Sequence, residues 1–290
     1  MEELVYLNGS LIPRSEAKVS IYDHGFLYGY GLFETMRAYH GKIFLLERHL
    51  KRLKDSADAL GLNLAGIDLE KACNDTLSAN NLKDARLRLT FTRGEVEGFP
   101  GPRMSGKPTV LVTAKSYTPL APEVYLGGYR VLIASVRQNS QSPISRLKTT
   151  NYLLYLMARM EAEAAGRDEA LLLNERGALT EGSTSNVFFV TPSGLVTPPL
   201  KSGLLPGVAR QVVIELAQEQ GVPISEVEVK PKDLPSFQEA FLTNSVMEIM
   251  PLVEIRDGNR SVAIGSGRPG RITLQLTAAY RKMVEAQTSK

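Results

Sequence analysis

Two stretches of the chain, residues 45–60 and 151–165, place apolar residues three or four positions apart, the spacing of an amphipathic helix, and two further helices are predicted from start and stop signals. The first stretch is followed by Gly61, a residue suited to a helix C-cap. Of the two further helices, one begins after Pro206-Gly207 and the other covers 272–287. Helices are therefore predicted at all four places. In the second stretch, the apolar residues on one face are Leu153, Leu154, Met157 and Met160.

Shorter apolar runs between turn residues predict strands. Residues 4–8 and 11–13 are separated by Asn8-Gly9, a dipeptide that favours a tight hairpin, here at the edge of a sheet. Further strands are predicted at 85–92, 109–114, 169–174, 186–190 and 239–243. This mixture of strands and helices predicts an α/β or α+β protein.

The Pro-rich stretch 117–122 is the best candidate for a domain boundary. A chain of 290 residues is long enough for two domains. We predict a smaller N-terminal domain (1–118), a linker (119–124) and a larger C-terminal domain (125–290).

The composition disfavours several classes of function. Hydrophobic residues make up 43% of the chain and charged residues 22%, as in most globular proteins. The net charge is only +3 and the charges are interleaved, which disfavours nucleic acid binding. One cysteine, Cys73, and three scattered histidines predict neither a disulfide nor a metal site. No leader or long apolar run is present, so a cytoplasmic protein without a membrane partner is predicted.

Lys148 is the first candidate for chemistry. It follows a Pro-containing loop, residues 142–145, and precedes the predicted helix 151–165. At such a packed boundary desolvation would lower the pKa of its ammonium group, and the amine could then bind a carbonyl carbon. The alternative is a solvated surface lysine, which is the more common role for this residue type.

Glu181 is the second candidate. It begins a polar run, residues 181–186, that leads directly into the apolar run 187–190. A donor-rich turn at the mouth of a buried strand is suited to form the wall of a ligand site. Taken alone, however, a Glu beside Gly182 fits an exposed turn better.

Two Gly-containing segments precede predicted helices. Residues 203–210 would offer the backbone N–H groups of a helix N-terminus to a phosphate, although an ordinary Pro-Gly helix start explains the pattern as well. Residues 265–270 match the G-x-G-x-x-G pattern of dinucleotide-binding folds. No second strand can follow the last predicted helix, so this segment is predicted to be a Gly-rich turn.

Several segments together resemble the class IV aminotransferases, which bind pyridoxal 5'-phosphate (PLP). They are the runs 23–29, 31–37 and 49–53 and the surroundings of Lys148, Glu181, Gly207 and Ser245. The resemblance covers almost the whole chain. It implies a fold-type IV enzyme with a small N-terminal and a larger C-terminal domain, PLP at their interface, and a homodimer whose partner contributes to the active site.

The resemblance also implies roles for individual residues. Lys148 corresponds to the family's Schiff-base lysine, Glu181 to the carboxylate that faces the pyridine nitrogen, and Tyr152 to the tyrosine near the phenolic oxygen. Such a carboxylate keeps the ring protonated, so that the ring can withdraw electrons from the substrate Cα. The implied phosphate ligands are Arg52, the amides of Val208 and Ala209, and Ser245. The candidate substrate-binding residues are Tyr28, Phe33 and Arg88, and no metal is implied.

Three activities share this scaffold: branched-chain amino acid transamination, D-amino acid transamination, and the lyase step from aminodeoxychorismate to 4-aminobenzoate and pyruvate. Phe33-Glu34-Thr35 and Leu242–Ser245 look more like the lyase or D-amino acid groups, as does Thr92-Arg93-Gly94, whereas Arg88 lines up with a carboxylate-binding arginine of the branched-chain group. The alternative for Arg88 and Arg93 is a pair of solvated strand residues. We predict an aminotransferase acting between an amino acid or primary amine and a 2-oxo acid, with aminodeoxychorismate lyase as the alternative. A binding or regulatory protein without chemistry is disfavoured, because both Lys148 and Glu181 are present.

Overall fold

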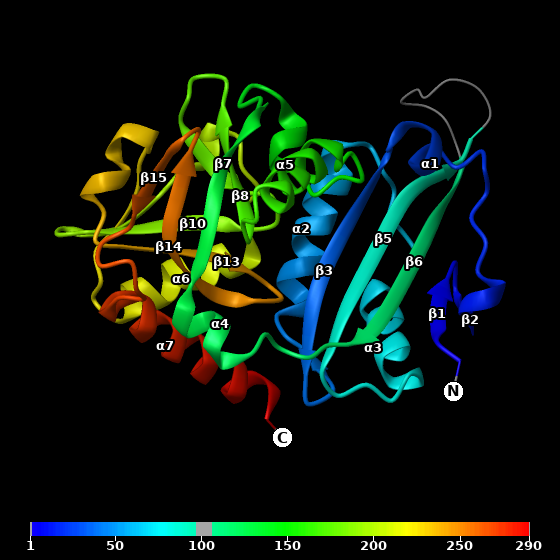
Figure 1. Ribbon diagram of the computed structural model, residues 1–290. Helices are drawn as coiled ribbons and strands as arrows, with labels where there is room; N and C mark the ends of the chain where they lie inside the picture. Colours follow the sequence, from blue (N-terminus) through cyan, green and yellow to red (C-terminus); the bar gives the residue numbers. More distant parts are fainter. Residues whose placement is uncertain (1, 97–105, 290) are drawn as a thin grey trace. The chain divides into compact units, whose positions relative to one another are not determined.

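The computed structural model describes residues 2–96 and 106–289, which divide into two compact units (Figure 1). Unit 1 comprises Met1–Thr118, Leu147–Asn151 and Val284–Lys290, and unit 2 comprises Pro119–Arg146 and Tyr152–Met283. The chain therefore returns to unit 1 twice after Thr118, and the first return carries Lys148. The sequence-based division into two domains and a linker stays a prediction, and no local pattern marks the two returning segments.

Unit 1 is built on an antiparallel sheet in the order β2-β1-β6-β5-β3-β4. Its strands are β1 (Leu4–Leu7), β2 (Ser10–Pro13), β3 (Gly31–Tyr39), β4 (Lys42–Ile43), β5 (Ala85–Glu95) and β6 (Lys107–Ser116). The predicted edge hairpin is confirmed, since β2 lies at the end of the sheet and pairs with β1. Asn8 and Gly9 adopt φ values of 49° and 103°, as a two-residue hairpin turn requires.

Helices α2 (Leu46–Ala59) and α3 (Leu69–Ala79) pack against this sheet, and a short helix, α1 (His24–Tyr28), precedes β3 (Figure 1). The predicted helix 45–60 is confirmed as α2, whose apolar stripe buries Leu53 and Ala57. Along β5, Leu87 and Leu89 belong to the core that also contains residues of the helices. Arg86 and Arg88, which alternate with these leucines, are exposed. Because side chains alternate along a strand, Arg88 lies on the sheet face away from α2 and α3.

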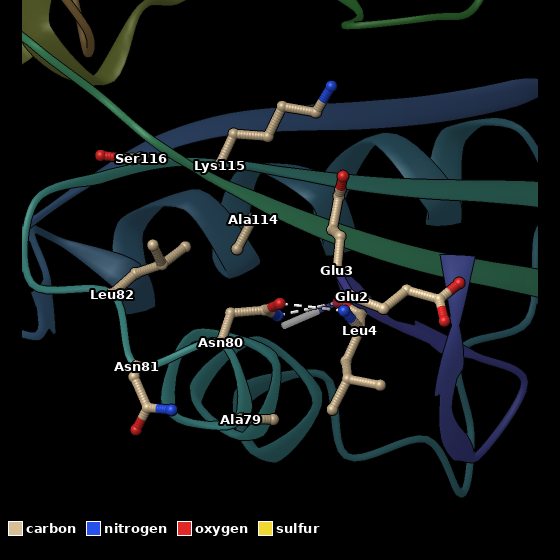
Figure 2. Close-up of a pocket in the computed structure, with 10 residues that line it drawn as sticks. All are labelled: Glu2, Glu3, Leu4, Ala79, Asn80, Asn81, Leu82, Ala114, Lys115 and Ser116. Atoms are coloured by element: carbon tan, nitrogen blue, oxygen red, sulfur yellow. Dashed lines mark hydrogen bonds between the residues drawn. The ribbon is translucent and has the colours of Figure 1, made fainter. Parts of the chain in front are cut away.

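A surface hollow of about 550 Å³ lies where β1, the end of α3 and the end of β6 meet (Figure 2). Asn80 points into it and binds the backbone of Leu4 twice, accepting from its N–H at 2.9 Å and donating to its carbonyl at 2.8 Å. This side chain therefore ties the first strand to α3. None of the predicted site residues lines the hollow.

Unit 2 contains, among the described residues, a nine-stranded mixed sheet in the order β12-β11-β10-β13-β14-β7-β8-β9, with β15 paired to β14. Its strands are β7 (Tyr129–Gln138), β8 (Glu169–Asn174), β9 (Leu179–Gly182), β10 (Asn186–Thr191), β11 (Gly194–Thr197), β12 (Ile224–Glu226), β13 (Glu239–Asn244), β14 (Glu248–Asp257) and β15 (Arg260–Ala263). The strands predicted at 169–174, 186–190 and 239–243 are confirmed as β8, β10 and β13. Both β8 and β10 are buried almost throughout, which places β9 and its Glu181 next to a rigid core.

The helices that begin in unit 2 are α4 (Pro122–Gly127), α5 (Leu153–Ala164), α6 (Val208–Glu219) and α7 (Arg271–Thr288). The predicted helix 151–165 is confirmed as α5, but its apolar face is not the face that it buries. Leu153 and Met160 are 68% and 66% exposed, whereas Ala158 and Ala162 are fully buried against β7 and β8. Within the described part of the chain, no helix has the length and apolar character needed to cross a membrane.

Candidate active site

Lys148 lies on an extended segment that pairs with the start of β3. The N–H of Phe33 donates to the Lys148 carbonyl, the N–H of Thr150 donates to the Gly31 carbonyl, both at 2.9 Å, and Thr149 forms an antiparallel bridge with Leu32. These bonds hold the backbone on both sides of the lysine. The sheet of unit 1 therefore fixes the backbone position of Lys148. The residue itself is half-buried.

The ring of Phe33 brings two cationic side chains together. The Lys148 Nζ lies 4.5 Å from the centre of this ring, and the Arg88 guanidinium carbon lies 3.8 Å from it. Arg88 is opposite Thr35 in the β3–β5 register, so it projects from the same sheet face as Phe33. The structure thus places the predicted residue Phe33 in contact with both Lys148 and Arg88. Tyr28, the third substrate candidate, ends α1 and packs edge-on against His24.

Arg52 belongs to a buried charged cluster in unit 1. Its Nε and Nη2 donate to the two oxygens of Glu34 at 2.8 and 2.5 Å, and His49 Nδ1 lies 2.7 Å from Glu34 Oε2. Burial by itself would raise the pKa of Glu34, but Arg52 and His49 outweigh it and lower that pKa to about 2. Burial lowers the pKa of His49, so this ring is neutral at pH 7. Glu34 therefore fixes the guanidinium of the predicted phosphate ligand.

Glu181 is buried in unit 2 and accepts hydrogen bonds at both oxygens. The Tyr155 hydroxyl donates to Oε1 at 2.9 Å, while the Leu205 N–H and the Asn186 side-chain amide donate to Oε2 at 3.1 and 3.4 Å. These donors come from three different segments of the fold. They stabilise the ionised carboxylate, the form that its predicted role requires.

The hydroxyl-rich turn after Glu181 is held by another carboxylate, Glu169 of β8. Ser183, Thr184 and Ser185 all direct their hydroxyls to Glu169. The sequence predicts this run as the wall of a ligand site, and the structure shows that its hydroxyls fix the turn itself. The Ser183 carbonyl in turn accepts the hydroxyl of Tyr152 at 2.7 Å.

The N-terminus of α6 is the predicted phosphate site. The N-cap, Gly207, provides no side-chain cap for the amides of Val208 and Ala209. A Cβ at position 207 would lie 2.0 Å from Asn186 Oδ1, so only glycine fits without a shift of that side chain. The predicted ligand Ser245 lies in the turn after β13, which Asn244 shapes by accepting the N–H groups of Val246 and Met247 at 2.8 Å.

Five residues with evident roles were not site candidates from the sequence: Glu34, Gln138, Tyr155, Glu169 and Asn186. Glu34, Tyr155 and Asn186 each contact a candidate directly. Gln138 contacts Tyr155, and Glu169 holds the turn after Glu181, so these two act only through other residues. For Glu34 a signal exists, because a charged residue lies within an otherwise largely apolar run that forms β3. Glu34 and Asn186 also lie within segments that carry the family resemblance, although no role was assigned to them.

Comparison with known proteins identifies the family. The family model described as "Amino-transferase class IV" matches residues 31–255. A Methanocaldococcus jannaschii protein provisionally named branched-chain-amino-acid aminotransferase is 39% identical, over 96% of this chain and 95% of its own. Aminodeoxychorismate lyase of Bacillus subtilis is 34% identical over 97% and 95%, and D-alanine aminotransferase of Bacillus licheniformis is 31% identical over 99% of both chains.

Solved structures show the same fold. A branched-chain amino acid aminotransferase from T.th., solved with pyridoxamine 5'-phosphate, superposes with a TM-score of 0.90 at 30% identity, covering 99% of this chain and 95% of the other. The predicted mixed α/β architecture of fold type IV is therefore confirmed. Because a family model spans most of the chain and full-length relatives exceed 30% identity, this protein belongs to the class IV aminotransferase family and is an enzyme.

Proposed function

We propose that this enzyme is a PLP-dependent aminotransferase that moves an amino group between an amino acid, or a primary amine, and a 2-oxo acid. The observation that carries the proposal is the contact of both Lys148 and Arg88 with the ring of Phe33. An amino acid presents a reactive amine beside a carboxylate. A lysine amine and a guanidinium on one aromatic ring match these two groups.

The residues present fit PLP. The α6 N-terminus has backbone donors without a side-chain cap, as a phosphate dianion requires. Glu181 is a buried acceptor suited to a protonated ring nitrogen. Thr243, the cross-strand neighbour of Asn186, has a buried hydroxyl without a hydrogen-bond partner among the described residues, and a ligand oxygen could satisfy it.

Each residue has a defined task in this proposal. When bound, PLP supplies an aldehyde and an electron-withdrawing ring. Lys148 is the amine that binds the aldehyde carbon, and after its release by the substrate it carries the proton from the substrate Cα. Glu181 holds the proton at the pyridine nitrogen, and Arg88 orients the substrate carboxylate.

Tyr152 is proposed to contact the phenolic oxygen of PLP. It follows Lys148 by four residues, so the covalent chain alone keeps their Cα atoms within about 14 Å. The segment between them is fixed, since Thr150 and Asn151 both donate side-chain hydrogen bonds to the Gly29 carbonyl at 2.8 Å. The proposed phosphate ligands are Arg52, the amides of Val208 and Ala209, and Ser245.

Aminodeoxychorismate lyase stays the second candidate, because one relative of nearly equal length carries that name. Both reactions need Lys148 and a carboxylate-binding group, so the observed contacts support either.

We also propose a homodimer. Large apolar side chains are exposed along the segment around α1, including Ile21 at 67%, Tyr22 at 62% and Phe26 at 73%, and a second copy would cover them. The cytoplasmic location stays a prediction from the sequence.

Borohydride reduction of the PLP-loaded enzyme tests the proposal. Reduction should fix PLP covalently on a single lysine, and mass spectrometry should locate it on the peptide that contains Lys148. The Lys148→Ala variant should show neither the visible absorbance of the bound cofactor nor the adduct. Lys115→Ala, an exposed lysine of β6, is the control and should retain both. An adduct that persists in Lys148→Ala would place the reactive lysine elsewhere.

A substrate panel then separates the two reactions. Branched-chain L-amino acids, D-alanine and a primary amine are each supplied with 2-oxoglutarate or pyruvate, and aminodeoxychorismate is supplied alone. Amino transfer to the 2-oxo acid supports the aminotransferase. Release of pyruvate and 4-aminobenzoate without amino transfer would replace it with the lyase.

A further inference from the structure

Tyr155 of α5 contacts both residues of unit 2 that are proposed to meet the PLP ring. Its hydroxyl donates to Glu181 Oε1 at 2.9 Å, and its ring stacks on that of Tyr152 with the centres 4.8 Å apart and the planes 26° apart. Tyr155 itself has no role in the proposed reaction. One side chain thus fixes the carboxylate and supports the neighbouring aromatic ring.

The hydrogen bonds around Tyr155 run in one direction. Burial raises the pKa of its hydroxyl and the charge of Glu181 raises it further, so the hydroxyl stays protonated and is the donor to Glu181. Gln138 Nε2 of β7 donates to the Tyr155 oxygen at 2.6 Å. Because the only proton of the hydroxyl is engaged with Glu181, the Gln138 amide must present its N–H to this oxygen. The order of donation is therefore Gln138, Tyr155, Glu181.

We propose that Tyr155 is a positioning residue that orients the Glu181 carboxylate and keeps it ionised, and that Gln138 orients Tyr155. This inference rests on the proposed function only where it assigns a consequence for catalysis. The contact itself lies within unit 2 and involves no cofactor. In a buried environment each donor in such a chain polarises the next, so the effect of Gln138 reaches the carboxylate through Tyr155.

The physical consequence concerns the basicity of Glu181. A hydrogen bond to the ionised form favours that form, and the titratable groups acting on the Tyr155 hydroxyl are Glu181 of β9 and Tyr152 beside it. Without the Tyr155 donor the pKa of the Glu181 carboxyl should rise by about one to two pH units. A more basic carboxylate takes a larger share of the proton at the ring nitrogen, and the ring then withdraws electrons less effectively.

The Tyr155→Phe variant removes the hydroxyl and keeps the ring stacked on Tyr152. In cofactor-free protein labelled with ¹³C at the glutamate carboxyl carbon, the Glu181 signal is assigned by its loss in Glu181→Gln and titrated by NMR. Tyr155→Phe should raise this pKa by about one unit or more. Tyr125→Phe, which removes a hydroxyl that donates to the Met247 carbonyl at 3.2 Å, should leave it unchanged. An unchanged titration in Tyr155→Phe overturns the inference.

A double-mutant cycle tests the role of Gln138. Gln138→Met should raise the Glu181 pKa less than Tyr155→Phe does, and the double variant should match Tyr155→Phe alone, because Gln138 acts through Tyr155. Additive shifts would mean that Gln138 acts independently. If Tyr155→Phe does not fold, Gln138→Met alone decides, and no shift in that variant counts against the proposal.

Holoenzyme kinetics connect the contact to catalysis. Tyr155→Phe should lower kcat about tenfold with little change in KM, and should shift the pH titration of the visible absorbance of the bound cofactor. Full kcat in Glu181→Gln would refute the proposed role of Glu181 at the ring nitrogen while leaving the NMR result intact. A lowered kcat in Glu181→Gln together with full kcat in Tyr155→Phe would instead refute the positioning role alone.

Discussion

Two helix N-termini in unit 2 follow similar Gly-containing sequence but have different partners. At α6, the N-cap Gly207 contributes no side chain, and a Cβ there would meet Asn186. At α7, the carboxylate of Glu239 on β13 accepts the N–H groups of Ile272 and Thr273 at 3.0 and 2.8 Å and the Thr273 hydroxyl at 2.7 Å. At α6 no side chain caps the first amides, whereas at α7 a carboxylate of the protein accepts them.

The stronger glycine motif therefore precedes the helix whose first amides already have a partner in the protein. The segment 265–270 matches G-x-G-x-x-G, but the helix dipole and first amides of α7 are occupied by an anionic side chain. The segment before α6 matches no such pattern, yet its first amides have no side-chain cap, as the proposed phosphate site requires. A glycine-rich approach to a helix is therefore informative only when the partners of the first amides are known.

The largest expected effect comes from giving α6 a carboxylate of its own. Gly207→Asp would place a negative charge beside the proposed phosphate, and at about 4 Å the repulsion is on the order of 4 kcal/mol. PLP affinity, measured by fluorescence titration, should fall about 1000-fold relative to Gly207→Ala. The alanine variant is the matched control, since it adds the same Cβ without the charge. Pyridoxal, which lacks the phosphate, should bind both variants equally. If PLP affinity fell by the same factor in Gly207→Asp and in Gly207→Ala, the phosphate would bind elsewhere.

Glu34 adds a further comparison, because its carboxylate is bound by the guanidinium of Arg52 and not by helix amides. Its pKa falls from 4.5 to about 2 on folding, so its stabilisation is complete above pH 4.5 and is lost as the pH drops toward 2. The loss should be on the order of 3 kcal/mol in the free energy of unfolding, measured by urea titration across this range. Glu34→Gln should be less stable at pH 7 and should lose less over the same range. The exposed Glu47→Gln variant of α2 should keep the wild-type pH profile.

The smallest effect is expected at α7. Glu239→Ala removes the acceptor of two amides and a hydroxyl, which should lower the free energy of unfolding by about 1–3 kcal/mol. PLP affinity should not change, because this helix end takes no part in the proposed site. Urea unfolding and the same fluorescence titration measure the two quantities, and the exposed Glu285→Ala variant of the same helix provides the reference. A large loss of PLP affinity in Glu239→Ala would contradict the distinction between the two helix ends.

Local sequence features predicted local structure well. The Asn8-Gly9 hairpin, α2, β8 and β13 follow from turn residues and from apolar periodicity, which act within a few positions along the chain. Long strands such as β3, β7 and β14 were not singled out. β3 and β14 are buried over most of their length, so they lack the regular alternation that marks a strand with one exposed face. In α5 the pattern gave the helix but not its buried side, which the small residues Ala158 and Ala162 form against the sheet.

The sequence by itself determined the family, the candidate lysine and carboxylate, and most helices, because these depend on residue type and short-range spacing. Only the tertiary structure decided which groups hold these candidates. Phe33 joins Lys148 to Arg88 across paired segments, Glu34 fixes Arg52 between a strand and a helix, and Tyr155 reaches Glu181 from α5. Hydrogen bonds and ring contacts act over a few ångströms in space, whereas their partners are separated by up to 115 positions between Phe33 and Lys148. No local sequence pattern can indicate a contact between residues so far apart along the chain.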